Sequence, residues 1–176
     1  METEVCLCDG LEEYSRATVI IGNLVMAVWI GLGTAACYFF NHVVAWVFLA
    51  VALLMVFVVL RKLVCTNCYY YDRWCSTGWG KLSALMFKQG RLEKFNDSIG
   101  IKLAPATYGL LTLAPLVFGT ISAVRDFSVV KVVVLVCLLL IGFYSGAISR
   151  KRSCARCKMR GFCRGSAIKP VESGSS

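Results

Sequence analysis

The chain of 176 residues is strongly apolar and basic. Hydrophobic residues make up 58% of it, charged residues only 16%, and the mean hydropathy is +0.70. Because soluble domains carry about 25% charged residues and disordered chains are poor in apolar ones, this composition argues against both classes. The net charge of +9 is compatible with anionic lipid or nucleic acid as a partner, and the placement of the charges decides between them.

The apolar residues gather in four blocks. Residues 17–40, 43–60 and 103–124 contain no charged side chain, and residues 129–148 contain only Lys131. A helix needs about 20 apolar residues to cross the hydrocarbon core of a bilayer, and no block shows the polar face of a helix in a soluble bundle. The sequence therefore predicts an all-α membrane protein with four transmembrane helices.

Four spans divide the chain into five parts. An acidic segment at 1–16 precedes a first transmembrane hairpin at 17–60, and a loop with cysteines and an amphipathic segment follows at 61–102. A second hairpin at 103–148 leads to a cysteine motif and a disordered tail within 149–176. An even number of spans places both termini and the central loop on the same side of the bilayer.

Nearly all basic residues fall on that side. Among the 19 Lys and Arg residues, only Arg125 and Lys131 belong to the opposite side. The positive-inside rule makes the basic side cytoplasmic, so we expect an inner or plasma membrane protein with cytoplasmic termini. Because the bases flank the spans, attraction to anionic headgroups of the lipid bilayer accounts for them, and nucleic acid is not an expected partner.

The cysteines follow the same division. Of the ten, Cys37 and Cys137 fall inside spans, where we expect them to pack as small apolar residues. The other eight, the candidate metal ligands, are Cys6, Cys8, Cys65, Cys68, Cys75, Cys154, Cys157 and Cys163. They lie on the predicted cytoplasmic side, where thiols stay reduced. Reduced, clustered cysteines indicate metal or redox chemistry.

Six of these cysteines form two similar triads. Residues 61–78 read RKLVCTNCYYYDRWCSTG, and residues 150–165 read RKRSCARCKMRGFCRG. Each stretch follows the second span of a hairpin, opens with Arg-Lys, and continues with Cys-x2-Cys and a third cysteine. The pattern predicts an internal repeat, with the two hairpins related by a pseudo-twofold axis along the membrane normal.

The spacing within a triad suits metal binding. Two thiolates two residues apart can hold one metal from a single turn, and a third can return to the same centre, as in zinc and iron–sulfur sites. The spacing Cys154-x2-Cys157-x5-Cys163 resembles the motif that holds [4Fe–4S] clusters in iron–sulfur nucleases and in auxiliary-cluster domains of some radical enzymes. There the fourth ligand comes from elsewhere in the chain. The resemblance implies an iron–sulfur cluster, and zinc is the alternative metal.

Several fourth ligands are compatible with the sequence. Cys6 and Cys8 would complete two four-cysteine sites, but the two residues lie only about 7 Å apart in an extended chain, so both sites would be close neighbours. Alternatively, the six triad thiolates form one shared binuclear site, or a three-thiolate site stays open to a substrate. Asp72 is a further candidate, unless it pairs with Arg73, and Cys6 and Cys8 could instead be acylated.

Residues outside the triads give weaker signals. Residues 79–99 predict a basic amphipathic helix, interrupted at Gly90, that lies at the headgroup level or packs on the cysteine loop. Asn23 is expected to bond a neighbouring helix within the membrane. Pro105 and Pro115 are expected to kink the third span.

The sequence contains no familiar catalytic constellation, so enzyme activity is not favoured. It has no Ser-His-Asp set, phosphate-binding loop or Rossmann glycine pattern. We expect a membrane metalloprotein that serves electron transfer or redox sensing with a cytoplasmic or membrane partner. One alternative is a structural zinc protein for assembly or docking. Another is a thiophilic-metal transporter, similar in size and span number to small mercury-uptake proteins; those place a cysteine pair in the first span, where this chain has only Cys37.

Overall fold

The computed structural model describes residues 8–168, so Cys6 and the tail predicted to be disordered, 169–176, lie outside the described residues. Within the described range the chain is all-helical, with no strand and one isolated parallel β-bridge between Leu11 and Cys157. The elements in chain order are α1 (Arg16–Tyr38), α2 (His42–Leu54), η1 (Met55–Val59), α3 (Leu60–Val64), η2 (Cys65–Asn67), α4 (Trp79–Met86), η3 (Leu92–Lys94), α5 (Ile99–Arg125), α6 (Val129–Phe143), η4 (Tyr144–Ser149) and α7 (Arg150–Ala155).

Four helical stretches are long and apolar enough to cross a membrane: Arg16–Tyr38, His42–Asn67, Ile99–Arg125 and Val129–Ala155. They confirm the four predicted helices and are compatible with a multi-pass membrane protein. The second and fourth stretches continue beyond the apolar blocks, through the Arg-Lys pairs and the first cysteine of each triad. Lys and Arg are good helix formers and suit the negative end of the helix dipole, so the helices do not stop where the apolar residues stop.

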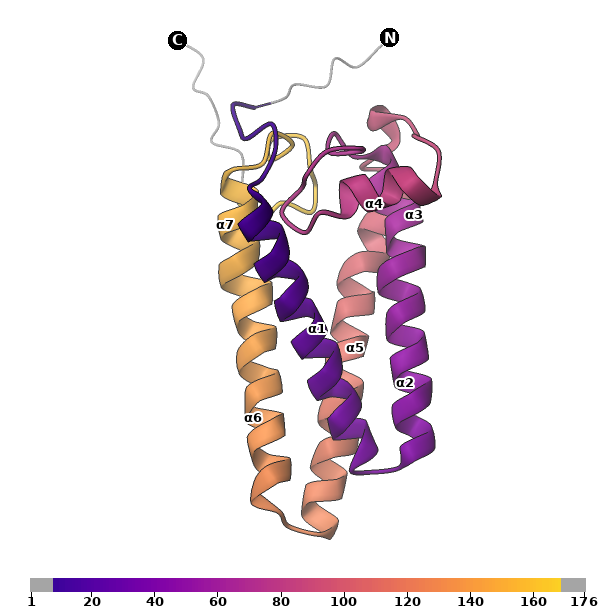
Figure 1. Ribbon diagram of the computed structural model, residues 1–176, viewed down its shortest axis with the longest axis vertical. Helices are drawn as coiled ribbons and strands as arrows, with labels where there is room; N and C mark the ends of the chain where they lie inside the picture. The colour runs from indigo at the N-terminus through magenta and orange to yellow at the C-terminus, as the bar shows by residue number, and fades with distance from the viewer. Residues whose placement is uncertain (1–7, 169–176) are drawn as a thin grey trace.

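Polar side chains begin the first two spans. The Ser15 hydroxyl accepts a hydrogen bond from the backbone N–H of Thr18 at 3.3 Å, and the Asn41 side chain accepts one from Val43 at 2.8 Å. These are N-cap bonds that satisfy free amides in the first turn. The second cap lies in the short turn between α1 and α2, where the two helices meet before they diverge towards their other ends (Figure 1).

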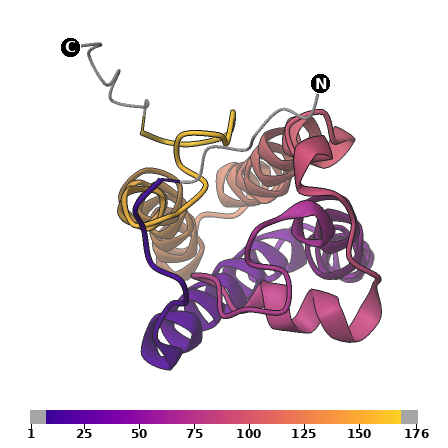
Figure 2. The same ribbon diagram turned by 90° about the horizontal axis from the view of Figure 1, so that it is seen from above.

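Helix α1 is the centre of the helix packing. It contacts α2, α5 and α6, while α5 also contacts α3 and α6, and Figures 1 and 2 show the resulting four-helix arrangement. Small residues permit the close approach: Gly33 lies against the Phe48 ring and Pro115, and Gly119 lies against Leu135. Close backbone contact through small residues is a common way to pack helices in membranes.

The helices bury a narrow core and leave large apolar side chains outside. The buried core residues are Trp29, Ile30, Cys37, Ala45, Phe48, Ala52, Val56, Trp79, Leu111 and Leu138. The outer faces expose residues such as Trp46, at 67%, and Leu140, at 63%. An apolar exterior of this kind suits contact with lipid hydrocarbon rather than water.

Helix α5 contains both prolines of the third span. It is continuous from Ile99 to Arg125, with Pro105 and Pro115 in its interior. Pro115 is fully buried and touches Gly33 of α1. Neither proline ends the helix, and the second takes part in helix packing.

Two π-helical segments, η1 and η4, were not predicted. Each lies in the second span of a hairpin, a few residues before the first cysteine of the triad that follows. A π-turn holds more residues per turn than an α-helix and re-aims the residues that follow it, and such turns are frequent near functional sites.

The predicted amphipathic helix at 79–99 is shorter than expected. Helix α4 ends at Met86, and Gly90 belongs to the non-helical stretch that follows. The Gly90 N–H donates to the carbonyl oxygen of Thr66 at 2.9 Å, so tertiary contact with the end of the second span replaces helical hydrogen bonds. The apolar face is also divided: Trp79 is 8% exposed, whereas Leu85 is 82% exposed.

Candidate metal centre

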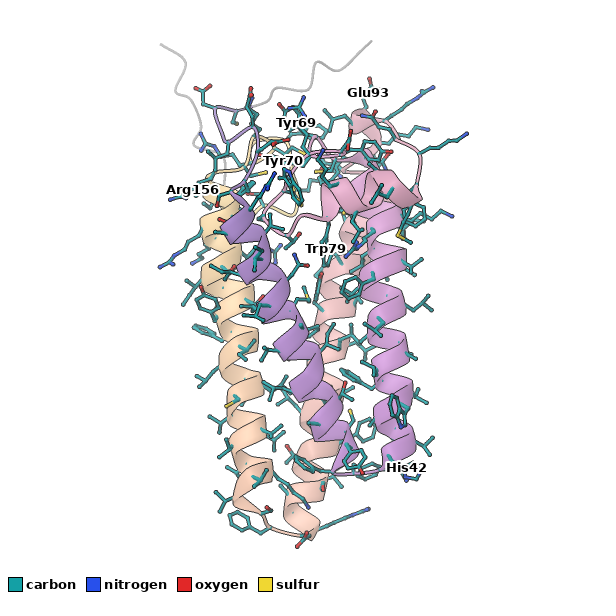
Figure 3. The ribbon with its side chains drawn as sticks, in the orientation of Figure 1. His42, Tyr69, Tyr70, Trp79, Glu93 and Arg156 are labelled. Atoms are coloured by element: carbon teal, nitrogen blue, oxygen red, sulfur yellow. The ribbon has the colours of Figure 1, made fainter. Side chains whose placement is uncertain are left out.

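The segments that carry both triads lie at the same end of the helices. Figure 1 shows the start of α1 together with α3, α4 and α7 at this end. We call residues 8–15, 65–98 and 154–168 the cap. In Figure 3, Tyr69, Tyr70 and Trp79 lie at this end, and His42 lies at the opposite end. The only histidine of the chain is therefore remote from the two cysteine triads.

The first triad sits on a loop between the second span and α4. The backbone N–H of Cys68 donates to the Cys65 carbonyl oxygen at 3.3 Å, which closes a tight turn between the first two cysteines. The third, Cys75, accepts a hydrogen bond at its sulfur from the Trp79 backbone N–H at 3.1 Å. Gly80 lies against the carbonyl oxygens of Tyr70 and Arg73, where any side chain would collide.

The second triad has the same kind of turn. The Cys157 N–H donates to the Cys154 carbonyl oxygen at 3.2 Å, and the Arg160 N–H donates to the Cys157 carbonyl oxygen at 3.2 Å. The first loop has the equivalent second bond, from the Tyr71 N–H to the Cys68 carbonyl oxygen at 3.0 Å. Both Cys-x2-Cys motifs thus follow the same succession of backbone hydrogen bonds.

Backbone amides oppose the effect of burial on three thiols. Burial raises the pKa of Cys68, Cys157 and Cys163 above the usual thiol range, because a buried thiolate loses hydration. In each case the backbone N–H two residues later lowers the pKa; these amides belong to Tyr70, Met159 and Gly165. Amides aimed at sulfur favour the thiolate form, which is the form that binds metals.

The two loops meet at Met159, a residue that the sequence analysis did not single out. Its side chain is 1% exposed. The Cys68 thiol donates to the Met159 sulfur at 3.4 Å, and the Tyr69 backbone N–H donates to the same sulfur at 3.2 Å. Nearby, the Asn96 amide donates to the Phe162 carbonyl oxygen at 2.6 Å. The loops of the two triads are thus in direct contact.

The N-terminal segment joins the second loop. The Cys8 N–H donates to the Lys158 carbonyl oxygen and the Leu11 N–H to the Arg156 carbonyl oxygen, both at 2.9 Å. The Cys8 sulfur lies beside Gly161, so close that a Cβ there would be 2.7 Å from it. Of the two N-terminal cysteines, the one that the structure describes is therefore a neighbour of the second triad.

Tyr70 ties all three parts of the cap together. Its hydroxyl donates to the Leu11 carbonyl oxygen at 2.6 Å and accepts from the Lys158 backbone N–H at 3.2 Å. Its ring packs edge-on against Tyr14, with 5.7 Å between the centroids. Burial raises the pKa of Tyr70 to about 12, so the phenol keeps its proton, and its hydrogen bond to Leu11, at neutral pH.

Asn23 bonds the first loop rather than a neighbouring membrane helix. Its amide donates to the carbonyl oxygens of Val19 and Thr77, both at 2.8 Å, and its oxygen accepts from the Trp79 indole N–H at 3.4 Å. Polar groups in apolar surroundings are costly unless bonded. This side chain therefore fixes α1 to the segment that follows Cys75.

The described cysteines are neighbours, but they do not converge. Within residues 8–168, no three histidine, cysteine or carboxylate side chains are arranged to hold a metal ion. Asp72 does not face the triad: its side chain is 67% exposed and lies 3.7 Å from Lys81. The expected pairing of Asp72 with Arg73 is wrong, because the Arg73 guanidinium instead lies over the Tyr69 ring at 4.7 Å.

Comparison with protein-family models, curated proteins and solved structures finds no match. The residues of the cap are therefore the basis for a functional proposal.

Proposed function

We propose that this chain is a multi-pass membrane protein that binds a metal centre through the cysteines of its cap, with an iron–sulfur cluster favoured, and serves electron transfer or redox sensing. One observation carries the proposal. Two cysteine loops distant in the sequence lie against each other at one end of the helices, with Cys68 and Met159 in contact through their sulfur atoms. Soft sulfur donors gathered in one place suit iron–sulfur clusters or zinc.

The backbone amides that donate hydrogen bonds to the cysteine sulfurs also suit a bound metal. The Trp79 amide donates to the Cys75 sulfur, and amides reach Cys68, Cys157 and Cys163. Hydrogen bonds to cysteine sulfur are one of the means by which a protein sets the potential of an iron–sulfur cluster. Metal binding would require the thiols to lose their protons and draw closer together than they lie here.

Two four-cysteine sites remain our preferred ligand arrangement. Cys154, Cys157 and Cys163 would form one site with Cys8, which the N-terminal segment brings to this loop. Cys65, Cys68 and Cys75 would form the other. Cys6 is their proposed fourth ligand, and it lies outside the described residues.

We also propose that the hairpins are an internal repeat. Three features agree between the halves: a π-helical segment in the second span, an Arg-Lys pair after it, and the same turn between the first two cysteines. A duplicated hairpin accounts for all three. The loops differ in length because the first triad has one more residue before its last cysteine.

We place the cap in the cytoplasm. Nearly all Lys and Arg residues belong to the cap or to the helix ends beside it, and the positive-inside rule makes that side cytoplasmic. An iron–sulfur centre there would supply one-electron transfer. A polar pocket of about 340 Å³, lined by residues that include Cys68, Tyr69 and Arg73, opens beside the first triad, and it offers a redox partner a route to the centre.

Anaerobic purification of the full chain in detergent tests the proposal. We expect broad absorption near 400 nm, by general iron–sulfur behaviour, with iron and sulfide present in the protein. Cys75→Ser and Cys163→Ser should each reduce the iron content, whereas Cys137→Ser, in α6, should not. Colourless protein with stoichiometric zinc would favour the docking function instead. Protein without metal after anaerobic reconstitution would contradict both.

A further inference from the structure

Arg61 is a charged residue whose side chain is almost completely buried. It lies in α3, just before the first triad, and only 1% of its surface is exposed. Its Nε and Nη2 atoms are buried and have no hydrogen-bond partner among the described residues. A buried guanidinium without a partner is strongly unfavourable. A negatively charged group close to Arg61 would therefore stabilise it.

No carboxylate supplies that charge within the described residues. The ion pairs there join Lys81 to Asp72, Lys131 to Asp126 and Lys158 to Glu12. The aromatic rings of Phe57 and Trp79 each lie 4.7 Å from the guanidinium carbon. Cation–π contacts stabilise the charge only in part, and they leave the two buried nitrogens without acceptors.

The ionisable groups that remain beside Arg61 are two thiols of the first triad and the phenol of Tyr108 in α5, and a thiol loses its proton more readily than a phenol. Cys65 and Cys75 are close enough to act on Arg61 electrostatically. Cys65 is four residues further along the same helical stretch, so both side chains share one face. Trp79 supplies a second link, because its ring stacks on Arg61 while its backbone N–H donates to the Cys75 sulfur.

We propose that Arg61 is the buried counter-cation of a metal–thiolate centre at the first triad. The inference rests on the proposed metal function and adds the residue that balances its charge. The three thiolates of the triad around a divalent ion, or around an oxidised [4Fe–4S] core, carry one net negative charge, and a fourth thiolate from Cys6 makes it two, so one guanidinium offsets half or all of it. Arg61 therefore stabilises the loaded site, and in a cluster it stabilises the more negative, reduced form and raises the reduction potential.

The second triad lacks this arrangement. Arg150 occupies the equivalent place in the second motif, yet it is exposed, and its guanidinium donates to the Gly165 carbonyl oxygen at 2.7 Å. The two centres would therefore differ in electrostatic surroundings although their cysteine motifs are similar. The first would have the higher potential.

A cycle of metal removal and mutation tests the inference. Arg61→Met removes the charge, Arg61→Lys keeps it, and Lys62→Met is the matched control because Lys62 is exposed. Metal affinity is measured by chelator competition, and thermal unfolding by circular dichroism, in the loaded and the metal-free forms. Arg61→Met should weaken metal binding about tenfold or more, since a charged interaction is lost. It should lower the melting temperature of the loaded protein but not that of the metal-free protein.

The outcomes separate the two proposals. A loaded wild type whose affinity is unchanged in Arg61→Met, or an equal fall in melting temperature in both forms, would overturn the role of Arg61 alone. A wild type that takes up no metal would overturn the proposed function and this inference together. If Arg61→Met does not fold, Arg61→Lys is the deciding variant. It should retain more metal than a Cys75→Ser variant. An equal loss of metal in these two variants would contradict the inference.

Discussion

At the scale of single residues, Met159 joins the two loops with a neutral sulfur. The thioether accepts hydrogen bonds from a thiol and an amide of the other loop. Its flexible side chain fills space that a branched residue would fill less well. It is one of several contacts between the two loops, beside the bond from Asn96 to Phe162.

Met159→Leu and Met159→Ala separate these two contributions. Leucine keeps most of the volume but loses the acceptor, so we expect a cost of about 1 kcal/mol in unfolding free energy. Alanine also leaves a cavity, and its cost should be about 2–5 kcal/mol. Denaturation in detergent, followed by circular dichroism, measures both values. A negligible cost for Met159→Leu beside a large cost for Met159→Ala would show that the sulfur acts only by its volume.

The Tyr70 hydroxyl can be tested by its removal. Tyr70→Phe keeps the ring but leaves the Leu11 carbonyl and the Lys158 amide without this partner. We expect a loss of about 1–3 kcal/mol and faster proteolysis of the N-terminal segment. Tyr38→Phe, on an exposed residue of α1, is the control. Unchanged proteolysis of Tyr70→Phe would mean that the other contacts of the N-terminal segment hold it without the Tyr70 hydroxyl.

Sequence reasoning found the cysteines of the cap but not the residues that organise them. A pair of thiols two residues apart is visible in any sequence because the spacing itself carries the chemistry. Met159, Tyr70 and Arg61 become important only through partners distant in the sequence. In the sequence, Arg61 is one of two adjacent basic residues that follow the second apolar block. Its exposure of 1% sets it apart from the exposed Lys62.

At the scale of elements, α4 packs against the first loop because glycines occupy two positions at the start of the helix. Gly78 has a positive φ of 71° and forms the N-cap of α4. Gly80 lies under the loop, where a Cβ would collide with the carbonyl oxygens of Tyr70 and Arg73. The turn that brings Trp79 to Cys75 thus depends on two glycines.

Gly80→Ala should therefore displace the first loop. Because the colliding atoms belong to the backbone, we expect a destabilisation of about 1–3 kcal/mol and a loss of metal from the first triad. Gly31→Ala is the matched control, since nothing lies within 4 Å of its Cβ position. Thermal unfolding and metal analysis of both variants provide the comparison. Full metal content in Gly80→Ala would contradict the proposed dependence of Cys75 on α4.

The spans were predictable for a simple reason, and their details were not. Apolar blocks of membrane length determine where helices form, whatever their neighbours. The stretch that follows the early end of α4 makes tertiary contacts, such as the bond from Gly90 to Thr66. No local pattern of residue types encodes these contacts.

At the scale of the whole molecule, the cap unites segments from the beginning, middle and end of the chain. Glu12 and Lys158, 146 residues apart, form an ion pair at 3.1 Å. The cysteines of the second triad therefore have Cys8 as a neighbour, which the sequence could only suggest by counting ligands. Whether the halves hold separate centres can be tested through this residue.

A chain in which Cys65, Cys68 and Cys75 are replaced by serine isolates the second triad. If Cys8 is the fourth ligand there, adding Cys8→Ser should remove most of the remaining metal, because three thiolates hold it less firmly than four. Adding Cys6→Ser should leave it unchanged. Metal analysis after gel filtration gives the result. If Cys6→Ser removes the remaining metal and Cys8→Ser does not, Cys6 rather than Cys8 is the fourth ligand of the second triad.

The pairing of Leu11 with Cys157 has a consequence for biosynthesis. The ribosome makes Leu11 long before Cys157, because the four long helices lie between them in the sequence. The backbone N–H groups of Cys8 and Leu11 therefore have no partner in the second loop until the fourth helix has been made, although the Leu11 carbonyl oxygen can already accept from Tyr70. A chain that stops before Arg156 therefore leaves these two amides without the partners that they have in the cap.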